Sequence, residues 1–177
     1  ARPYRLRAEQ NFLPAIEDLE AAVTSRTRAL LINSPSNPLG TVLPAALLAD
    51  IGAFAEHHDL IVISDEAYDE IAFTGPAPSI AAVSDPARVI SCFSFSKTFA
   101  MTGWRVGYLV APAALEDALG KIQDTSLICA SIASQRAAVA ALHVGRAHVA
   151  PHVHALDRTR RRVHEALAAS GLPCETS

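Results

Sequence analysis

Lys97 is the side chain whose chemistry stands out first in this sequence. The chain of 177 residues carries 15 Lys and Arg side chains, yet Lys97 and Lys121 are the only lysines. An arginine stays protonated in proteins, whereas a lysine amine can lose its proton, attack a carbonyl carbon and form a Schiff base. A solitary lysine is more often a solvated surface charge. The residues around Lys97 therefore decide between a covalent role and a surface role.

The elements that position Lys97 follow from the hydrophobic pattern. Short apolar runs at residues 29–33, 60–64, 89–93 and 106–111 predict strands, and residues 14–23 and 43–59 have helical spacing. This alternation predicts an α/β domain with a mostly parallel sheet, and the continuous apolar character of the runs predicts helices on both faces, hence three layers. After Pro112 the pattern is mainly helical and includes a long helix at 147–170 that stops at Gly171.

Polar residues follow three successive predicted strands. Ligands of open α/β sheets bind beyond the carboxyl ends of the strands, so these residues should share one edge. They are Asn33 and Asn37 after the first strand, Asp65 and Tyr68 after the second, and Ser94, Ser96 and Lys97 after the third.

Three stretches carry a family resemblance. NSPSNPLGT (33–41), ISDEAYDEI (63–71) and SFSKTFAMTGWRVGYLVAP (94–112) resemble, in order and separation, the fold-type I pyridoxal-phosphate enzymes, and most closely the class I/II aminotransferases. The resemblance extends over essentially the whole chain. It implies pyridoxal 5'-phosphate as cofactor, an amino acid and a 2-oxo acid as substrates, and a homodimer of the full-length parent.

The resemblance implies three catalytic residues. Lys97 would hold the cofactor aldehyde as a Schiff base and, once released, would move the proton of the substrate α-carbon. Asp65 would face the pyridine nitrogen and favour the protonated ring, which is the better electron sink. Tyr68, together with Asn37, would hydrogen-bond the phenolic oxygen of the cofactor and help to set the pKa of the Schiff base.

The resemblance also implies a phosphate site. Ser94 and Arg105 would bind the cofactor phosphate, with Ser96 as a third ligand, because a planar guanidinium grips phosphate through two parallel hydrogen bonds. Gly103 and Gly107 are predicted to allow tight backbone paths beside Arg105.

Each of these residues also has a purely structural interpretation. Asp65 could cap the turn that follows its strand, and Asn37 could be a turn residue before Pro38. Tyr68 could be a core aromatic, and Arg105 could belong to a structural ion pair. Because the three motifs occur together and in order, the functional interpretation of these residues is favoured.

Two further patterns match known kinds of site only in part. Ser94 and Lys97 satisfy the S-x-x-K motif of serine acyl-enzymes, but the S-D-N-type and K-T-G elements of that class do not occur in the sequence. His148, His152 and His154 are close in sequence, but Pro151 and the lack of carboxylate or cysteine partners argue against a metal site.

Two alternatives keep the fold and change the function. A carbon–sulfur lyase or cyclopropane-forming synthase shares the same cofactor motifs, so these residues do not separate it from a transaminase. Some transcription regulators carry an aminotransferase-like sensor domain behind a DNA-binding domain, and the residues encoded before Ala1 would distinguish that case.

The composition of the chain narrows the remaining classes of function and location. The net charge is −3 and half of the residues are hydrophobic, which predicts one domain with a sizeable core and no nucleic-acid partner. No apolar run is long enough to predict a membrane span. The three cysteines, Cys92, Cys129 and Cys174, are far apart and predict free thiols in a reducing compartment, which makes the cytoplasm the expected location.

The ends of the sequence predict a fragment, since the chain does not open with Met and stops in a loop-like GLPCETS. We expect residues 1–146 to be the C-terminal part of the large cofactor-binding domain, 147–170 a connecting helix, and 171–177 the start of a small domain. Relatives of the family also carry a phosphate-binding turn and a ring-stacking aromatic upstream, and an arginine for the substrate carboxylate downstream.

Overall fold

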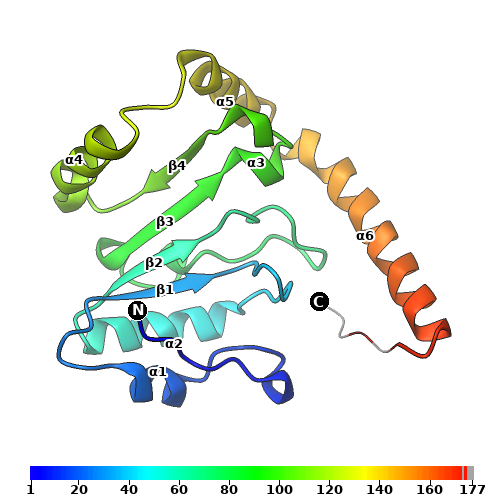
Figure 1. Cartoon of the computed structure of the whole chain (residues 1–177), viewed down its shortest axis with the longest axis horizontal. Coiled ribbons are helices and arrows are strands. Elements are labelled where there is room, and N and C mark those ends of the chain that lie inside the picture. The colour runs from blue at the N-terminus through cyan, green and yellow to red at the C-terminus, as the bar shows by residue number, and fades with distance from the viewer. Residues whose placement is uncertain (173, 175–177) are drawn as a thin grey trace.

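A four-stranded sheet is the centre of the computed structural model, which describes residues 1–172 and 174 (Figure 1). The strands β1 (Ala29–Asn33), β2 (Ile61–Asp65), β3 (Val89–Ser94) and β4 (Gly107–Val110) are neighbours in the order β1-β2-β3-β4. The first two pairs are parallel, and β4 is antiparallel to β3. The predicted α/β fold with a mostly parallel sheet is confirmed, and each predicted strand lies within a residue or so of the observed one.

The strand register brings the predicted polar residues to one edge. Asn33 at the end of β1 pairs with Asp65 at the end of β2, and Asp65 pairs with Cys92 of β3. The antiparallel β4 returns from this edge, so Gly107 lies opposite Ser94. The side chains that follow β1, β2 and β3 therefore start from adjacent points of the sheet.

The main hydrophobic core lies between this sheet and two helices, α1 (Ile16–Ala22) and α2 (Ala45–His57). In α2 the buried residues recur at helical spacing, and this places an apolar stripe against the buried side of the strands. The members that are at most 2% exposed are Leu19, Ile32, Leu48, Ile51, Ala55, Leu60, Val62 and Ile80.

The cover of β1 differs from the prediction. Leu30 and Ile32 are buried, but Leu31, which points to the opposite face, is 60% exposed. Successive side chains of a strand alternate between faces, and in the described chain α1 and α2 cover the face of Leu30 and Ile32. The continuous apolar run predicted cover on both faces, and the described residues supply that cover on the face of Leu30 and Ile32 but not over Leu31.

The second half of the chain is helical. It contains α3 (Phe95–Thr98), α4 (Glu116–Ser126), α5 (Ile132–Val144) and α6 (Arg146–Ala169), and α6 extends away from the sheet (Figure 1). Phe95, Met101 and Ala138 form a second buried cluster between the α3 turn and α5. Five short 3-10 helices complete the described elements: Ala8–Gln10, Ile80–Ala82, Pro86–Arg88, Thr102–Trp104 and Ala113–Leu115.

Glycines set both ends of the long helix. Gly145 separates α5 from α6 with a φ of 62°, which L side chains rarely adopt, and Gly171 follows the end of α6 with a φ of 71°. The predicted helix at 147–170 therefore agrees with α6 to within one residue at each end. No helix among the described residues is long and apolar enough to cross a membrane.

Candidate active site

Lys97 lies in the single helical turn α3, directly after β3. Its side chain is exposed, and its Nζ lies 5.6 Å from the centre of the Tyr68 ring. Within residues 1–172 and 174, Lys97 forms no ion pair with a carboxylate. The amine is therefore accessible, unpaired and beside an aromatic ring at the edge where the strands end.

Asn37 and Tyr68 meet across the two loops that follow β1 and β2. The Asn37 side-chain amide donates to the Tyr68 hydroxyl at 3.2 Å. Asn33 holds this arrangement, because its Oδ1 accepts from the Asn37 backbone N–H at 2.9 Å and its Nδ2 donates to the Asp65 carbonyl at 3.2 Å. The peptide bonds before Pro35 and Pro38 are both cis. The predicted Asn37–Tyr68 pair is thus brought together by a third residue, Asn33.

Asp65 ends β2 and is partly buried. Its Oδ1 accepts the backbone N–H of Ala67 at 3.1 Å, as the capping interpretation predicted. Oδ2 forms no hydrogen bond within the described chain. One oxygen therefore orients the carboxylate while the other can accept a proton donor. The adjacent Glu66 is 5% exposed and accepts from the Ser79 hydroxyl at 2.9 Å, so it belongs to the interior.

Ser94 and Arg105 flank the Lys97 turn. The Ser94 hydroxyl oxygen accepts the Ser96 N–H at 3.2 Å, which leaves its own proton available to an anion. Arg105 is exposed, has a left-handed backbone with a φ of 49°, and donates to the Thr102 carbonyl at 3.0 Å. The structural ion pair is not seen, since no described carboxylate lies within reach of Arg105. Ser96 is 8% exposed and thus less accessible than its neighbour Lys97.

The two predicted glycines behave differently. A Cβ at Gly107 would lie 2.5 Å from the Phe93 carbonyl oxygen, whereas a Cβ at Gly103 would meet nothing within 4 Å. The tight backbone path is therefore present at Gly107 and absent at Gly103.

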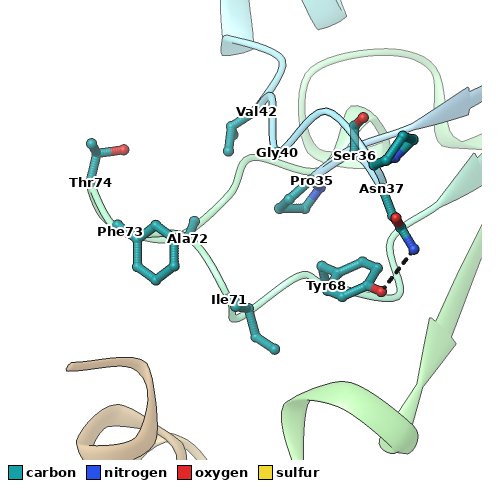
Figure 2. Close-up of a pocket in the computed structure, with 11 residues that line it drawn as sticks. Pro35, Ser36, Asn37, Gly40, Val42, Tyr68, Ile71, Ala72, Phe73 and Thr74 are labelled. Atoms are coloured by element: carbon teal, nitrogen blue, oxygen red, sulfur yellow. Dashed lines mark hydrogen bonds between the residues drawn. The ribbon is translucent and has the colours of Figure 1, made fainter. Parts of the chain in front are cut away.

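An apolar pocket of about 260 Å³ adjoins the Asn37–Tyr68 pair (Figure 2). It lies between the loop after β1 and the loop after β2, and the Asn37–Tyr68 hydrogen bond closes one end. Tyr68 lines the pocket and its ring centre also lies 5.6 Å from Lys97 Nζ, so the pocket and the amine share this side chain as a neighbour. Lys97 is not among the residues that line this pocket, so the pocket lies next to the reactive amine and not around it.

The carboxylates at this edge perturb neighbouring groups. The pKa of the Cys92 thiol is raised, first by burial and then by the negative charges of Asp65 and Glu66. The pKa of the Tyr108 hydroxyl is also raised, again first by burial and then by nearby carboxylates, of which Asp69 contributes most. The raised pKa values favour the protonated thiol of Cys92 and the protonated hydroxyl of Tyr108 near neutral pH.

The donor set fits pyridoxal phosphate. It offers an unpaired amine for the aldehyde, a carboxylate for the pyridine nitrogen, an amide–phenol pair for the phenolic oxygen, and a hydroxyl and a guanidinium for the phosphate. These groups belong to Lys97, Asp65, Asn37 with Tyr68, and Ser94 with Arg105. Among the described residues, no group of three His, Cys, Asp or Glu side chains could hold a metal ion.

Sequence reasoning missed three residues that support this site. The sequence pattern places Asn33 at a strand end without indicating a role for it, although it holds both the Asn37 loop and β2. Asp69 and Thr98 follow Tyr68 and Lys97 directly and are bonded to each other. Their positions next to the two predicted residues were the available signal, but the bond itself depends on the fold.

Comparison with known proteins agrees with this geometry. Residues 1–177 match the family of class I and II aminotransferases, and the chain belongs to this family, which uses pyridoxal phosphate. A putative aminotransferase of Bacillus subtilis, YugH, is 41% identical over 94% of this chain and 44% of its own length. Aromatic-amino-acid aminotransferase 2 of Thermococcus litoralis is 40% identical over 93% of this chain and 43% of its own length.

Solved structures of aminotransferases superpose closely on this chain. A double mutant of Thermus thermophilus aspartate aminotransferase superposes with a TM-score of 0.90 at 33% identity, over 95% of this chain and 44% of that one. An aromatic aminotransferase of Pyrococcus horikoshii superposes with a TM-score of 0.86 at 40% identity, over 93% of this chain and 45% of that one. The chain therefore spans less than half the length of these relatives.

Proposed function

We propose that the full-length protein containing this chain is a pyridoxal-phosphate-dependent aminotransferase that moves an amino group from an amino acid to a 2-oxo acid, with Lys97 as the Schiff-base lysine. The observation that carries the proposal is the unpaired Lys97 amine, 5.6 Å from the Tyr68 ring, at the sheet edge that also holds Asp65. Membership of the aminotransferase family supports it.

The residues would divide the work by chemistry. When bound, pyridoxal phosphate supplies a conjugated ring that accepts the electron pair left on the substrate α-carbon. Lys97 would hold the cofactor aldehyde, and its free amine would take the proton of the substrate α-carbon. Asp65 keeps a proton on the ring nitrogen, because a carboxylate favours a nearby cation. Asn37 and Tyr68 hold the phenolic oxygen.

The phosphate would be fixed separately from the reacting atoms. Ser94 and Arg105 present a hydroxyl and a guanidinium, and Ser96 would complete the set if its buried hydroxyl turned towards the anion. Anchoring the phosphate orients the ring, which keeps the aldehyde carbon within reach of Lys97.

The wider arrangement follows the same proposal. Residues 1–146 form the C-terminal part of the large domain, and α6, predicted as 147–170, connects it to a small domain that begins at 171–177. Residues 173 and 175–177 of that segment lie outside the described residues. A cytoplasmic homodimer is part of this proposal.

A direct test uses the two lysines as matched variants. We would record the visible spectrum of the full-length protein with pyridoxal phosphate, beside Lys97→Ala and Lys121→Ala. We expect a visible band from lysine-bound cofactor in the wild type and in Lys121→Ala, and its absence in Lys97→Ala. An equal band in Lys97→Ala would refute the assignment of Lys97.

Substrate tests would separate transamination from the alternatives. Relatives of similar identity are named for aspartate and for aromatic amino acids, so the panel should include both. We expect an amino acid to remove the visible band and a 2-oxo acid to restore it. Double-reciprocal plots of the steady-state rate should give parallel lines, as ping-pong half-reactions do. Release of pyruvate and ammonia without an acceptor would instead identify a lyase, and a band that no amino acid changes would favour a sensor.

A further inference from the structure

Asp69 and Thr98 join the two segments that carry Tyr68 and Lys97. The Thr98 hydroxyl donates to Asp69 Oδ1 at 2.7 Å, although the residues are 29 positions apart in the sequence. Asp69 directly follows Tyr68, and Thr98 directly follows Lys97. This hydrogen bond is therefore a cross-link between the backbone that positions the phenol and the backbone that positions the amine.

The environment makes this bond difficult to replace by water. Thr98 is 7% exposed and Asp69 is partly buried. Burial raises the pKa of the Asp69 carboxyl, while the hydrogen bonds from Thr98 and from the Glu70 backbone N–H, at 2.9 Å to the same oxygen, act in the opposite direction. A partly desolvated carboxylate depends on such donors, because an unsatisfied buried acceptor is costly.

A second contact fixes the same segment from the other side. The Arg146 guanidinium, at the start of α6, bonds both carboxylate oxygens of Glu70 at 2.7 and 2.9 Å. Residues 68–70 are thus held between the Lys97 turn and the long helix. With the loop fixed on that side, the Asp69–Thr98 bond sets how far the Tyr68 segment can move relative to the Lys97 turn.

We propose that Asp69 and Thr98 form a positioning pair that fixes the Tyr68 hydroxyl relative to the Lys97 amine. The inference rests on the proposed function for the roles of Tyr68 and Lys97. Neither member of the pair touches the cofactor in this account, so both act through their neighbours. If the pair is broken, Tyr68 should donate less well to the phenolic oxygen, which raises the pKa of the nitrogen that joins Lys97 to the cofactor.

The test compares three threonine variants of the full-length protein. Thr98→Val keeps the branched shape and removes the hydroxyl, and Thr98→Ser keeps the hydroxyl. Thr125→Val is the matched control, because the Thr125 hydroxyl bonds only the Lys121 carbonyl of its own exposed helix. The readouts are the affinity for pyridoxal phosphate and the pH midpoint of the visible band, with the unfolding midpoint of the apoprotein measured beside them.

We expect Thr98→Val to bind pyridoxal phosphate roughly two- to tenfold more weakly, the effect of one lost hydrogen bond, and to shift the spectral midpoint to higher pH. Thr98→Ser and Thr125→Val should resemble the wild type. Asp69→Ala removes the bond from the other side, and the double variant Asp69→Ala/Thr98→Val should be no weaker than the weaker single variant, because the two act as one unit.

Two results would overturn the inference and remain distinct from each other. If the wild type shows no Lys97-dependent band, the proposed function fails and the inference fails with it. If the wild type shows the band but Thr98→Val titrates like the wild type, the proposed function stands and the positioning pair is refuted, even if the variant unfolds more easily. If Thr98→Val does not fold, Asp69→Ala decides by the same readouts.

Discussion

Replacing Gly107 with Ala should separate β4 from β3 beside the predicted phosphate site. Gly107 pairs with Ser94 across the two strands, and a Cβ there would lie 2.5 Å from the Phe93 carbonyl oxygen. The obstacle is a backbone atom, so no side-chain rotation can relieve the contact. The strands themselves must move, and Ser94 moves with them.

The size of the effect follows from that distance. Real Cβ contacts essentially never fall below 3.0 Å, so the gap must widen by about 0.5 Å at least, and by about 0.9 Å to reach the ordinary limit of 3.4 Å. Inserting a methyl group into a packed position costs about 1–3 kcal/mol. The reduced entropy of the unfolded chain returns about 0.4–1 kcal/mol. Strain is the larger effect, so we expect a net loss of about 1–2 kcal/mol.

Urea unfolding of the full-length apoprotein, followed by far-UV circular dichroism, would measure the change in free energy of unfolding. The affinity for pyridoxal phosphate should fall as well, since Ser94 is displaced. Gly103→Ala is the matched control, because its Cβ would meet nothing within 4 Å and its φ is not positive. A Gly107→Ala variant as stable as Gly103→Ala would refute the argument from the strand contact.

Two further predictions concern the core and α6. Ile51 is 0% exposed, and Ile51→Ala should lower the free energy of unfolding by about 2–5 kcal/mol. Ile122 is 62% exposed, and Ile122→Ala should stay within about 0.5 kcal/mol of the wild type. Equal effects of the two variants in urea unfolding would contradict the assignment of the core. Hydrogen bonds from Arg160 and then Arg161 lower the pKa of Asp157 in the folded state. The Asp157 carboxylate therefore stabilises the fold above its unfolded pKa of about 4. This stabilisation disappears as the pH falls through the pKa of Asp157 in the folded state. Asp157→Asn should therefore lower the thermal midpoint at pH 7 but not at about pH 2, and a difference that persists at the lower pH would show that the carboxylate charge is not responsible.

The residues around the site divide into those a sequence can locate and those it cannot. Asn37, Asp65, Tyr68 and Lys97 each follow a strand closely, and the ends of parallel strands meet at one edge, so their proximity was predictable. Nothing in the sequence tells Gly107 from Gly103, since both lie two residues from Arg105 and both are predicted to allow tight backbone paths. Only the approach of the Phe93 carbonyl distinguishes the two glycines.

The sequence by itself determined the α/β class, the order of the elements and the chemical groups at the strand ends, because hydrophobic periodicity and strand polarity are local properties of the chain. The tertiary structure alone decided which side chains pair over long separations, as Thr98 does with Asp69 and Arg146 with Glu70. It also decided that α1 and α2 pack on the face of β1 that carries Leu30 and Ile32. These outcomes depend on how distant segments approach one another, and no local pattern encodes that approach.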